Sequence, residues 1–396
     1  MTMLAPGAQI FFAATRAVLE VFAVGALGVY AARAGTMDRR LARALAQFNG
    51  KYFLPALLWT SLSRSVTAER LREMWLLPLA CVAHVAIGLA LGLGVVRACG
   101  VAPGFRTVTT MSAAFGNSLA LPVVVTRAIT RNPRIGNLEF TEADGDRCVL
   151  YLSVYVVVLS ASMWSVGPWL FRRRIAARVS GGLESRASES DFARIEMRAG
   201  DGERGEEPSS APTRSPSFAK RTLDFTRAFL NPNVASCIAG VVTGIATPVR
   251  DIIFQPGRAL SWVGGAAQIL ADAAIPTVLL VIGSSLARGP DYALADKRTS
   301  LAIVGVRFVV IPMVTIGAYY ALRDAEGIAP DDKIFWLVFL CLGTTPTANN
   351  MMLQAQMFHP DDRAAAGVGT LLFWQYVTIP VFLTAYVSWY LAIIDR

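Results

Sequence analysis

The chain has 396 residues, of which 54% are hydrophobic and only 16% are charged. A soluble domain carries roughly a quarter charged residues, so this composition excludes a single water-soluble core and favours a protein embedded in a bilayer. The net charge of +9 comes mostly from arginines that lie between apolar stretches, which does not fit the folded basic face of a nucleic-acid-binding protein.

Apolar stretches of roughly 20 residues, the length that crosses a bilayer as a helix, recur along the whole chain. We therefore predict an all-α polytopic membrane protein with ten transmembrane helices. The expected spans are residues 8–32, 41–63, 74–97, 106–128, 147–171, 229–248, 259–287, 299–322, 333–357 and 364–393.

A long polar segment, residues 172–224, separates the fifth span from the sixth. It holds almost no large apolar residues and cannot bury enough surface to fold alone, so we predict a disordered loop. Its many basic residues place it in the cytosol and both termini on the other side. The predicted organisation is a first five-helix repeat at residues 1–171, this loop, and a second five-helix repeat at residues 225–396.

Prolines recur at matching places in the two halves. Pro55 in span 2 and Pro276 in span 7 are 221 residues apart, and Pro122 in span 4 and Pro346 in span 9 are 224 residues apart. Two five-span units account for this agreement. Because five is odd, the second unit enters the membrane from the opposite side, and the repeats are inverted, as in many secondary transporters.

Spans 4 and 9 carry the strongest helix-breaking signals. Span 4 contains Phe115-Gly-Asn-Ser-Leu-Ala-Leu-Pro122, and span 9 contains Gly343-Thr-Thr-Pro-Thr-Ala-Asn-Asn350. Proline and glycine interrupt a helix, and lipid tolerates the open backbone only where protein or a water-filled cavity surrounds it. We expect two broken helices that cross in the interior. Their half-helix N-termini would suit an anion without a fixed cation nearby.

The polar residues at these breaks are the candidate substrate site. Asn117 and Asn350 are the main candidates, because their amides can donate to a carboxylate. The alternative is hydrogen bonding between helices by small polar residues. The full candidate set, which adds the neighbouring break residues and two residues of span 2, is Asn117, Ser118, Pro122, Pro346, Asn349, Asn350, Thr60 and Ser61.

Ionisable residues inside spans are expensive and often functional. We expect Lys51 and Arg307 to lie near the membrane interfaces with their charges directed to water. His84 lies well inside span 3 and is a candidate proton carrier, the alternative being a neutral packed histidine. Asp272 is a candidate for charge coupling, pairing with a cation or a helix N-terminus.

Enzyme motifs are absent from the sequence, which lacks HExxH, GxSxG, a Walker loop and a dinucleotide fingerprint. The five cysteines include no CxxC pair and there are only two histidines, so we expect neither a metal site nor a cofactor.

Short motifs recur from span 2 to span 10. They are Pro55-Ala-Leu-Leu-Trp-Thr-Ser-Leu-Ser63, Phe115-Gly-Asn-Ser118 with Pro122, Asn231-Pro-Asn233, Asp272-Ala-Ala-Ile-Pro-Thr277, Pro346 to Asn350, Gln356-Met-Phe358 and Leu372-Phe-Trp-Gln-Tyr376. Together these motifs resemble the auxin efflux carrier superfamily, most closely its PIN-LIKES branch. The sequence departs from the family pattern at Leu119 and Ala120, where relatives usually carry a second Asn.

This resemblance implies a fold like that of bile-acid/sodium symporters. Spans 1, 2, 6 and 7 would form a scaffold, and spans 3–5 and 8–10 a mobile transport unit that carries substrate at the crossing of spans 4 and 9 in an elevator-like motion. The resemblance also implies a homodimer, weak-acid substrates such as indole-3-acetate, and the endoplasmic reticulum membrane rather than the plasma membrane.

The leading functional hypothesis is a secondary transporter or uniporter of small organic carboxylate anions. Two alternatives stay open. One is a non-transporting membrane receptor or scaffold that binds a small acid and signals through the central loop. The other is a sodium-coupled carboxylate symporter on the same fold.

Overall fold

The structure, a computed structural model, describes residues 6–66, 74–181, 232–287, 289–293, 295–325, 330–358 and 364–395. Most of the predicted disordered loop therefore lies outside the described residues. The first ten residues of that predicted loop, 172–181, are described and form the end of helix α8, which continues to Gly181.

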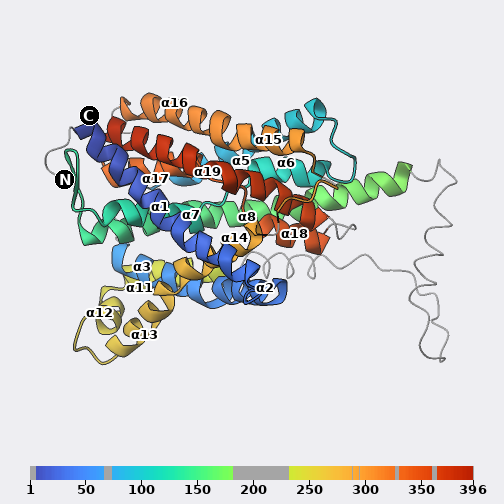
Figure 1. Ribbon diagram of the computed structural model, residues 1–396. Coiled ribbons are helices and arrows are strands. Elements are labelled where there is room, and N and C mark those ends of the chain that lie inside the picture. Colours follow the sequence, from blue (N-terminus) through green and yellow to red (C-terminus); the bar gives the residue numbers. More distant parts are fainter. Residues whose placement is uncertain are drawn as a thin grey trace, which may run out of the picture.

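The described chain is almost entirely helical (Figure 1). In chain order the elements are α1 (Pro6–Arg33), α2 (Arg39–Phe48), η1 (Asn49–Phe53), α3 (Leu54–Ser65), α5 (Leu76–Ala98), α6 (Arg106–Ala114), α7 (Ala120–Thr130), β1 (Arg134–Ile135), β2 (Leu138–Glu139), α8 (Glu142–Gly181), α11 (Pro232–Ile245), α12 (Thr247–Phe254), α13 (Ser261–Asp272), α14 (Ala274–Leu286), α15 (Lys297–Gly305), η3 (Val306–Val310), α16 (Ile311–Arg323), α17 (Lys333–Gly343), α18 (Asn350–Phe358) and α19 (Ala364–Ile394).

Membrane-length helices dominate the described residues. Six are long and apolar enough to cross a bilayer, or up to seven if the bent pair α11–α12 counts as one span. The helices α7 and α17 are apolar but shorter. The prediction of a helical, polytopic membrane protein is confirmed. Within the described residues, the strands that depart from an all-α chain form the antiparallel pair β1–β2, in which Arg134 faces Glu139.

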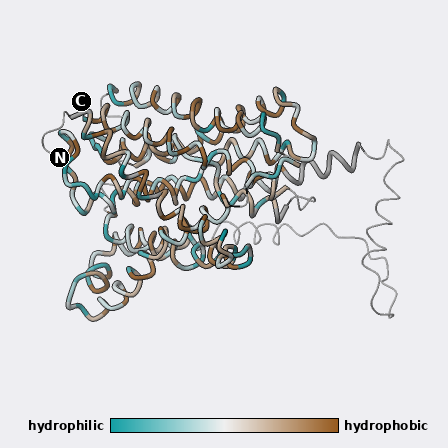
Figure 2. The backbone as a smooth tube through the Cα atoms, in the orientation of Figure 1, coloured by the Kyte–Doolittle hydropathy of each residue, from teal (hydrophilic) through white to brown (hydrophobic). Residues whose placement is uncertain are grey.

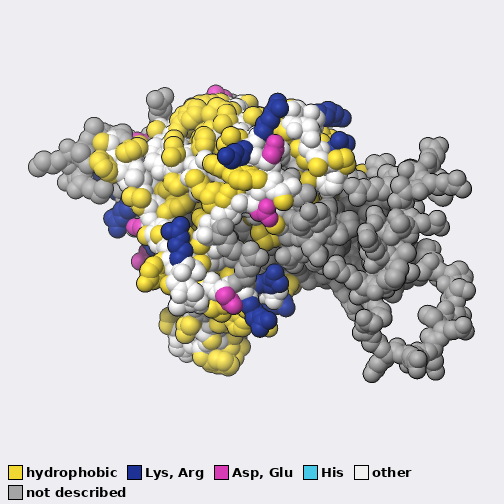
Figure 3. All heavy atoms as spheres, turned by 45° about the vertical axis from the view of Figure 1, so that its right-hand side comes forward, with side chains coloured by type: hydrophobic (Ala, Val, Ile, Leu, Met, Phe, Trp, Pro, Cys, Tyr) yellow, Lys and Arg dark blue, Asp and Glu magenta, His cyan; other side chains and the backbone are white. Residues whose placement is uncertain are grey.

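Apolar side chains lie on the outside of the protein as well as in its core. Trp262, Ile269 and Val381 are each at least 70% exposed. Figure 2 shows apolar residues along the long helices, and in Figure 3 hydrophobic side chains cover much of the described surface, with Lys, Arg, Asp and Glu side chains interspersed. Such a surface is stable against lipid and unfavourable against water.

The helices pack in two groups. In one, α1 packs on α14, and α3 packs on α11 and α13. In the other, α5 packs on α6 and α8, and α15, α17 and α18 pack on α19. The groups meet where α1 contacts α7 and α19, and where α3 contacts α8. Figure 1 shows α3, α11, α12 and α13 together on one side of the molecule, with α15, α16 and α19 on the other.

Glycines allow the closest helix contact in the first group. A Cβ on Gly283 of α14 would overlap the carbonyl oxygen of Gly25 in α1, and one on Gly28 would overlap the carbonyl of Leu280. Small residues of this kind let membrane helices approach each other closely and gain packing energy where lipid supplies no hydrophobic driving force.

Two π-helical segments, η1 and η3, precede prolines. Pro55 is the second residue of α3 and Pro312 the second residue of α16. A proline inside a continuous helical path removes one backbone donor and clashes with the turn before it, and a π-bulge relieves this by inserting one extra residue into the turn. The extra residue also rotates the side chains of η3, which include Arg307.

Candidate functional site

Both helix breaks predicted from the sequence are present in the structure. Residues 115–119 separate α6 from α7, and residues 344–349 separate α17 from α18. The four half-helices therefore present two N-termini, at Ala120 and Asn350, and two C-termini, at Ala114 and Gly343.

The breaks meet each other through their main chains. Gly116 and Thr347 form an antiparallel bridge. The Asn117 N–H donates to the carbonyl of Pro346 at 2.6 Å, and the Ala348 N–H donates to the carbonyl of Phe115 at 2.8 Å. Each break thus supplies partners for backbone groups that lost theirs when the helix ended, as a dry interior requires.

Asn117 is bonded on both sides of its amide. Its Nδ2 donates to the hydroxyl of Tyr376 in α19 at 3.3 Å, and its Oδ1 accepts from the N–H of Ala120 at 3.3 Å, where α7 begins. The Tyr376 hydroxyl in turn donates to Oδ1 of Asn349 at 3.4 Å. One tyrosine therefore joins an asparagine from each break. These bonds are long, and a ligand carboxylate could replace them at modest cost.

A second residue of α19 fixes the other break. Gln375 is fully buried, accepts from the N–H of Thr347 at 2.7 Å and donates to its Oγ1 at 3.0 Å. Thr347 donates onward to the carbonyl of Ser112 at 2.6 Å. Pro122 lies buried in the first turn of α7, and Ser118 is buried with its Oγ 3.4 Å from the carbonyl of Gly116.

The two asparagines at the end of the second break lie in different surroundings. Asn349 is half-buried and contacts Tyr376, whereas Asn350 is exposed and begins α18. The structure therefore brings Asn117, Ser118, Pro346 and Asn349 together at the crossing. Asn350 lies one residue further on, exposed at the start of α18.

Arg307 is buried at the crossing, where the sequence did not predict it. The expectation that it lies near an interface is wrong, because its residue is only 2% exposed. Its Nε donates to the carbonyl of Thr345 at 2.8 Å, its Nη2 to Oγ1 of Thr345 at 2.6 Å and its Nη1 to the carbonyl of Ala113 at 3.2 Å. A fixed cation is therefore present at the two breaks, in addition to the half-helix N-termini that the sequence predicted.

The backbone of Gly116 makes room for this guanidinium. A Cβ on Gly116 would overlap Nη2 of Arg307 and Oγ1 of Thr345. The contacts place the charge against the C-terminal ends of α6 and α17, whose free carbonyls carry partial negative charge.

His84 lies in a separate buried network of hydrogen bonds. Its Nε2 is 2.9 Å from Oγ1 of Thr315, and its Nδ1 is 3.0 Å from the hydroxyl of Tyr155. Thr315 uses its own hydrogen on the carbonyl of Ile311, so it accepts from His84 Nε2–H, and Tyr155 donates to Nδ1. This bonding pattern is that of a neutral histidine with both nitrogens engaged.

The span 2 candidates and Asp272 lie outside this network. Thr60 bonds back to the carbonyls of Ala56 and Leu57 within α3. Asp272 is exposed and accepts from Gln268 at 2.8 Å.

Ser61 belongs instead to a charged cluster between helices. Its Oγ is 3.2 Å from Nη2 of Arg127 and 3.3 Å from Oδ1 of Asp146, and these two residues form an ion pair at 3.0 Å. The cluster therefore ties α3 to α7 and α8.

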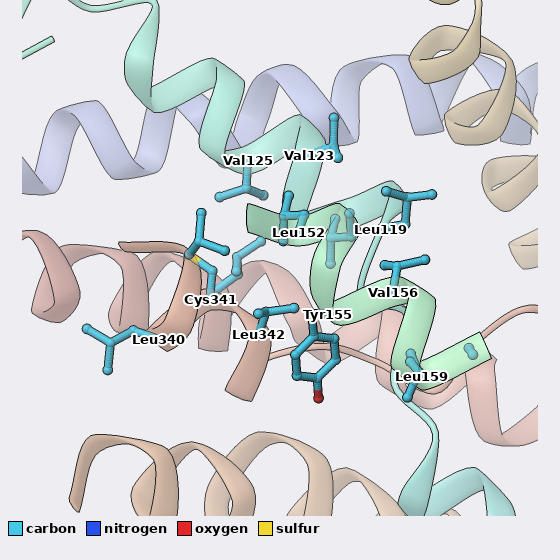
Figure 4. Packing of buried hydrophobic residues seen from close by; sticks show 14 of the residues in the cluster. Leu119, Val123, Val125, Leu152, Tyr155, Val156, Leu159, Leu340, Cys341 and Leu342 are labelled. Atoms are coloured by element: carbon cyan, nitrogen blue, oxygen red, sulfur yellow. The ribbon is translucent and has the colours of Figure 1, made fainter. Parts of the chain in front are cut away.

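Apolar packing holds the crossing in place. Figure 4 shows Leu119, Val123 and Val125 from the first broken helix near Leu152 and Val156 of α8. Leu340, Cys341 and Leu342 of α17 complete the group. Close packing of this kind fixes the position of the polar groups that it surrounds.

Metal ligands do not cluster in the described part of the chain, where no group of three or more His, Cys, Asp or Glu residues could hold an ion.

A crossing of two broken apolar helices around a polar cluster is an arrangement typical of membrane transporters. The chain belongs to the membrane transport protein family, which matches residues 13–387. This is a family of transporters and not of enzymes, and it confirms the resemblance seen in the short motifs.

Curated relatives cover most of the chain at modest identity. Protein PIN-LIKES 2 of Arabidopsis thaliana is 23% identical, over 93% of this chain and 92% of its own length. Protein PIN-LIKES 5 of the same plant is 24% identical, over 84% and 85%. A Schizosaccharomyces pombe protein described as an uncharacterized transporter is 21% identical, over 90% of both chains.

Sequence reasoning missed Arg307, Gln375 and Tyr376 as members of the site. The motif Leu372-Phe-Trp-Gln-Tyr376 contains two of them and was visible as a family feature. Arg307 carried a signal of its own, since it lies five residues before Pro312 within an apolar stretch. A buried arginine there needs several fixed acceptors, and helix breaks provide them.

Proposed function

We propose that this protein is a secondary transporter or uniporter of small organic carboxylate anions, with indole-3-acetate as the first substrate to test. The observation that carries the proposal is the crossing. Two broken helices are joined there by main-chain bonds, and Asn117, Ser118 and Asn349 gather around the join. Amide N–H groups and the helix N-termini at Ala120 and Asn350 supply donors for a carboxylate.

The architecture we propose is ten spans in two inverted five-helix repeats. In this architecture, consecutive helical segments combine into single spans. These spans are α2–η1–α3, α6–α7, α13–α14, α15–η3–α16 and α17–α18. The antiparallel bridge between Gly116 and Thr347 supports it, because a two-fold axis in the membrane plane relates crossing segments in this way.

We also propose which helices move during transport. We assign α1, α2–η1–α3 and α11–α14 to a scaffold, and α5–α8 with α15–α19 to a transport unit that moves as an elevator. The division into two packing groups supports this assignment. The Ser61–Arg127–Asp146 cluster then lies between scaffold and transport unit.

The choice of membrane and the oligomeric state are proposed from the family resemblance. We propose a homodimer in the endoplasmic reticulum membrane, with the loop between α8 and α11 in the cytosol. The names of the relatives from Arabidopsis thaliana support the choice of branch.

Uptake by proteoliposomes tests the transport proposal. The purified full chain is reconstituted, and entry of radiolabelled indole-3-acetate and other small carboxylates is followed. We expect uptake by wild type and at least about a tenfold loss in Asn117→Ala, since a hydrogen bond to a charged ligand contributes about 1.5–3 kcal/mol. Asn350→Ala should also lose uptake.

Asn132→Ala is the matched control, because this asparagine follows α7 and bonds only the main-chain carbonyls of Ala128 and Ile129 in the described structure. Undiminished uptake in both break variants would remove the site assignment. Binding of the acid without any uptake would favour a receptor. Uptake that requires sodium in the buffer would favour a sodium-coupled symporter.

A further inference from the structure

Arg307 carries a buried charge with no opposite charge beside it. The buried charged side chains of the described residues are Arg307 and Asp144, and Asp144 pairs with Arg147 at 2.8 Å. No aspartate or glutamate of the described chain lies within ion-pair distance of Arg307. Its acceptors are two carbonyls and a hydroxyl, all neutral. The guanidinium stays protonated in proteins, so one full positive charge sits inside the membrane-embedded part.

The charge lies at the crossing itself. Nη2 of Arg307 fills the space beside Gly116, the residue next to Asn117. Its hydrogen bonds reach both breaks, to Ala113 before the first and to Thr345 in the second. An anion held by Asn117 would therefore be separated from the guanidinium by the backbone of Gly116 and Asn117.

Helix ends do not cancel this charge. The C-termini of α6 and α17 stabilise the guanidinium locally with their partial charges. These partial charges come from neutral peptide groups, each with an equal positive end elsewhere in the same helix. They contribute nothing to the net charge that a moving unit carries through the membrane field.

We infer that Arg307 is the fixed counter-charge of the transported anion. This inference rests on the proposed function and adds an electrical property to it. A site loaded with a monocarboxylate is electrically neutral, whereas the empty site carries one positive charge. The membrane potential therefore acts on the return of the empty unit and not on the movement of the loaded one.

Substrate exchange isolates the loaded step, because only loaded units cross when acid is present on both sides. Proteoliposomes of the full chain are filled with unlabelled indole-3-acetate, and entry of the labelled acid is measured while potassium gradients with valinomycin set the potential. We expect wild-type exchange to be independent of potential. In Arg307→Gln the loaded unit carries one negative charge, and exchange should change by up to about tenfold over roughly 60 mV.

Two variants separate charge from structure. Arg307→Lys keeps the charge, and Thr345→Val removes the Nη2 acceptor while leaving the guanidinium in place. Whatever their rates, both should exchange without dependence on potential. A merely structural role for Arg307 would lower rates in all three variants and alter the potential dependence in none.

The outcomes are distinct from those of the transport proposal. Potential-dependent exchange by wild type overturns the inference and leaves transport standing, as does potential-independent exchange by Arg307→Gln. If Arg307→Gln does not fold, the wild-type measurement still decides. Wild type that moves none of the carboxylates defeats the proposed function and this inference with it.

Discussion

Gly116→Ala should destabilise the crossing, because the space that a methyl group needs is occupied. The new Cβ would overlap Nη2 of Arg307 and Oγ1 of Thr345, two atoms joined by a 2.6 Å hydrogen bond. Breaking this charge-assisted bond costs about 1.5–3 kcal/mol, and overpacking a core adds about 1–3 kcal/mol. The lower entropy of alanine in the unfolded chain returns less than about 1 kcal/mol. The net expected cost is about 3 kcal/mol.

Thermal denaturation of the detergent-solubilised protein, followed by fluorescence-detected size-exclusion chromatography, measures this effect. We expect the apparent melting temperature to fall by about 5 °C. The control is Gly94→Ala in α5, where nothing lies within 4 Å of the new Cβ. In an Arg307→Ala background the same Gly116→Ala change should cost less, because one of the two overlapping side chains is gone and Thr345 has lost the hydrogen bond that Gly116→Ala would break. Equal melting of Gly116→Ala and wild type would refute the reasoning.

Two further predictions concern helix packing and helix ends. Gly283→Ala should lower the melting temperature by forcing α1 away from α14, whereas Gly265→Ala in α13, with open space around its Cβ, should not; equal melting of the two variants would contradict the contact with Gly25. Asp332→Asn should cost about 1–3 kcal/mol, because Asp332 accepts from Arg147 at 2.5 Å and caps α17, and urea denaturation that leaves the variant unchanged would count against this role.

The breaks could be predicted from sequence because their cause is local. Each break combines a proline, at 122 or 346, with a glycine, at 116 or 343, and with clustered Asn, Ser or Thr residues, whereas helix α19 continues through the single proline Pro380. Backbone groups without helical partners must lie inside the protein in a bilayer, so the two breaks are expected to lie close together. The spacing of these residues also indicated that the two halves are related.

The partners of the breaks could not be predicted, because they depend on how distant helices pack. Tyr376 reaches Asn117 across 259 positions of sequence, and Arg307 reaches Ala113 across 194. Arg307 also lies in the π-helical segment η3, where side chains are spaced differently from those of an α-helix, and the sequence did not predict that segment. The cost of a charge inside a span suggested an arginine directed to the interface, and tertiary packing overrode that preference.

The bridge between the breaks has a consequence for how this site can be redesigned. The bonds from Asn117 to Pro346 and from Ala348 to Phe115 join main-chain atoms only. A side chain that is exposed beside this bridge, such as Asn350, can therefore be exchanged without breaking the bonds that join the two segments. A small library at position 350 should yield variants that remain as well folded as the parent.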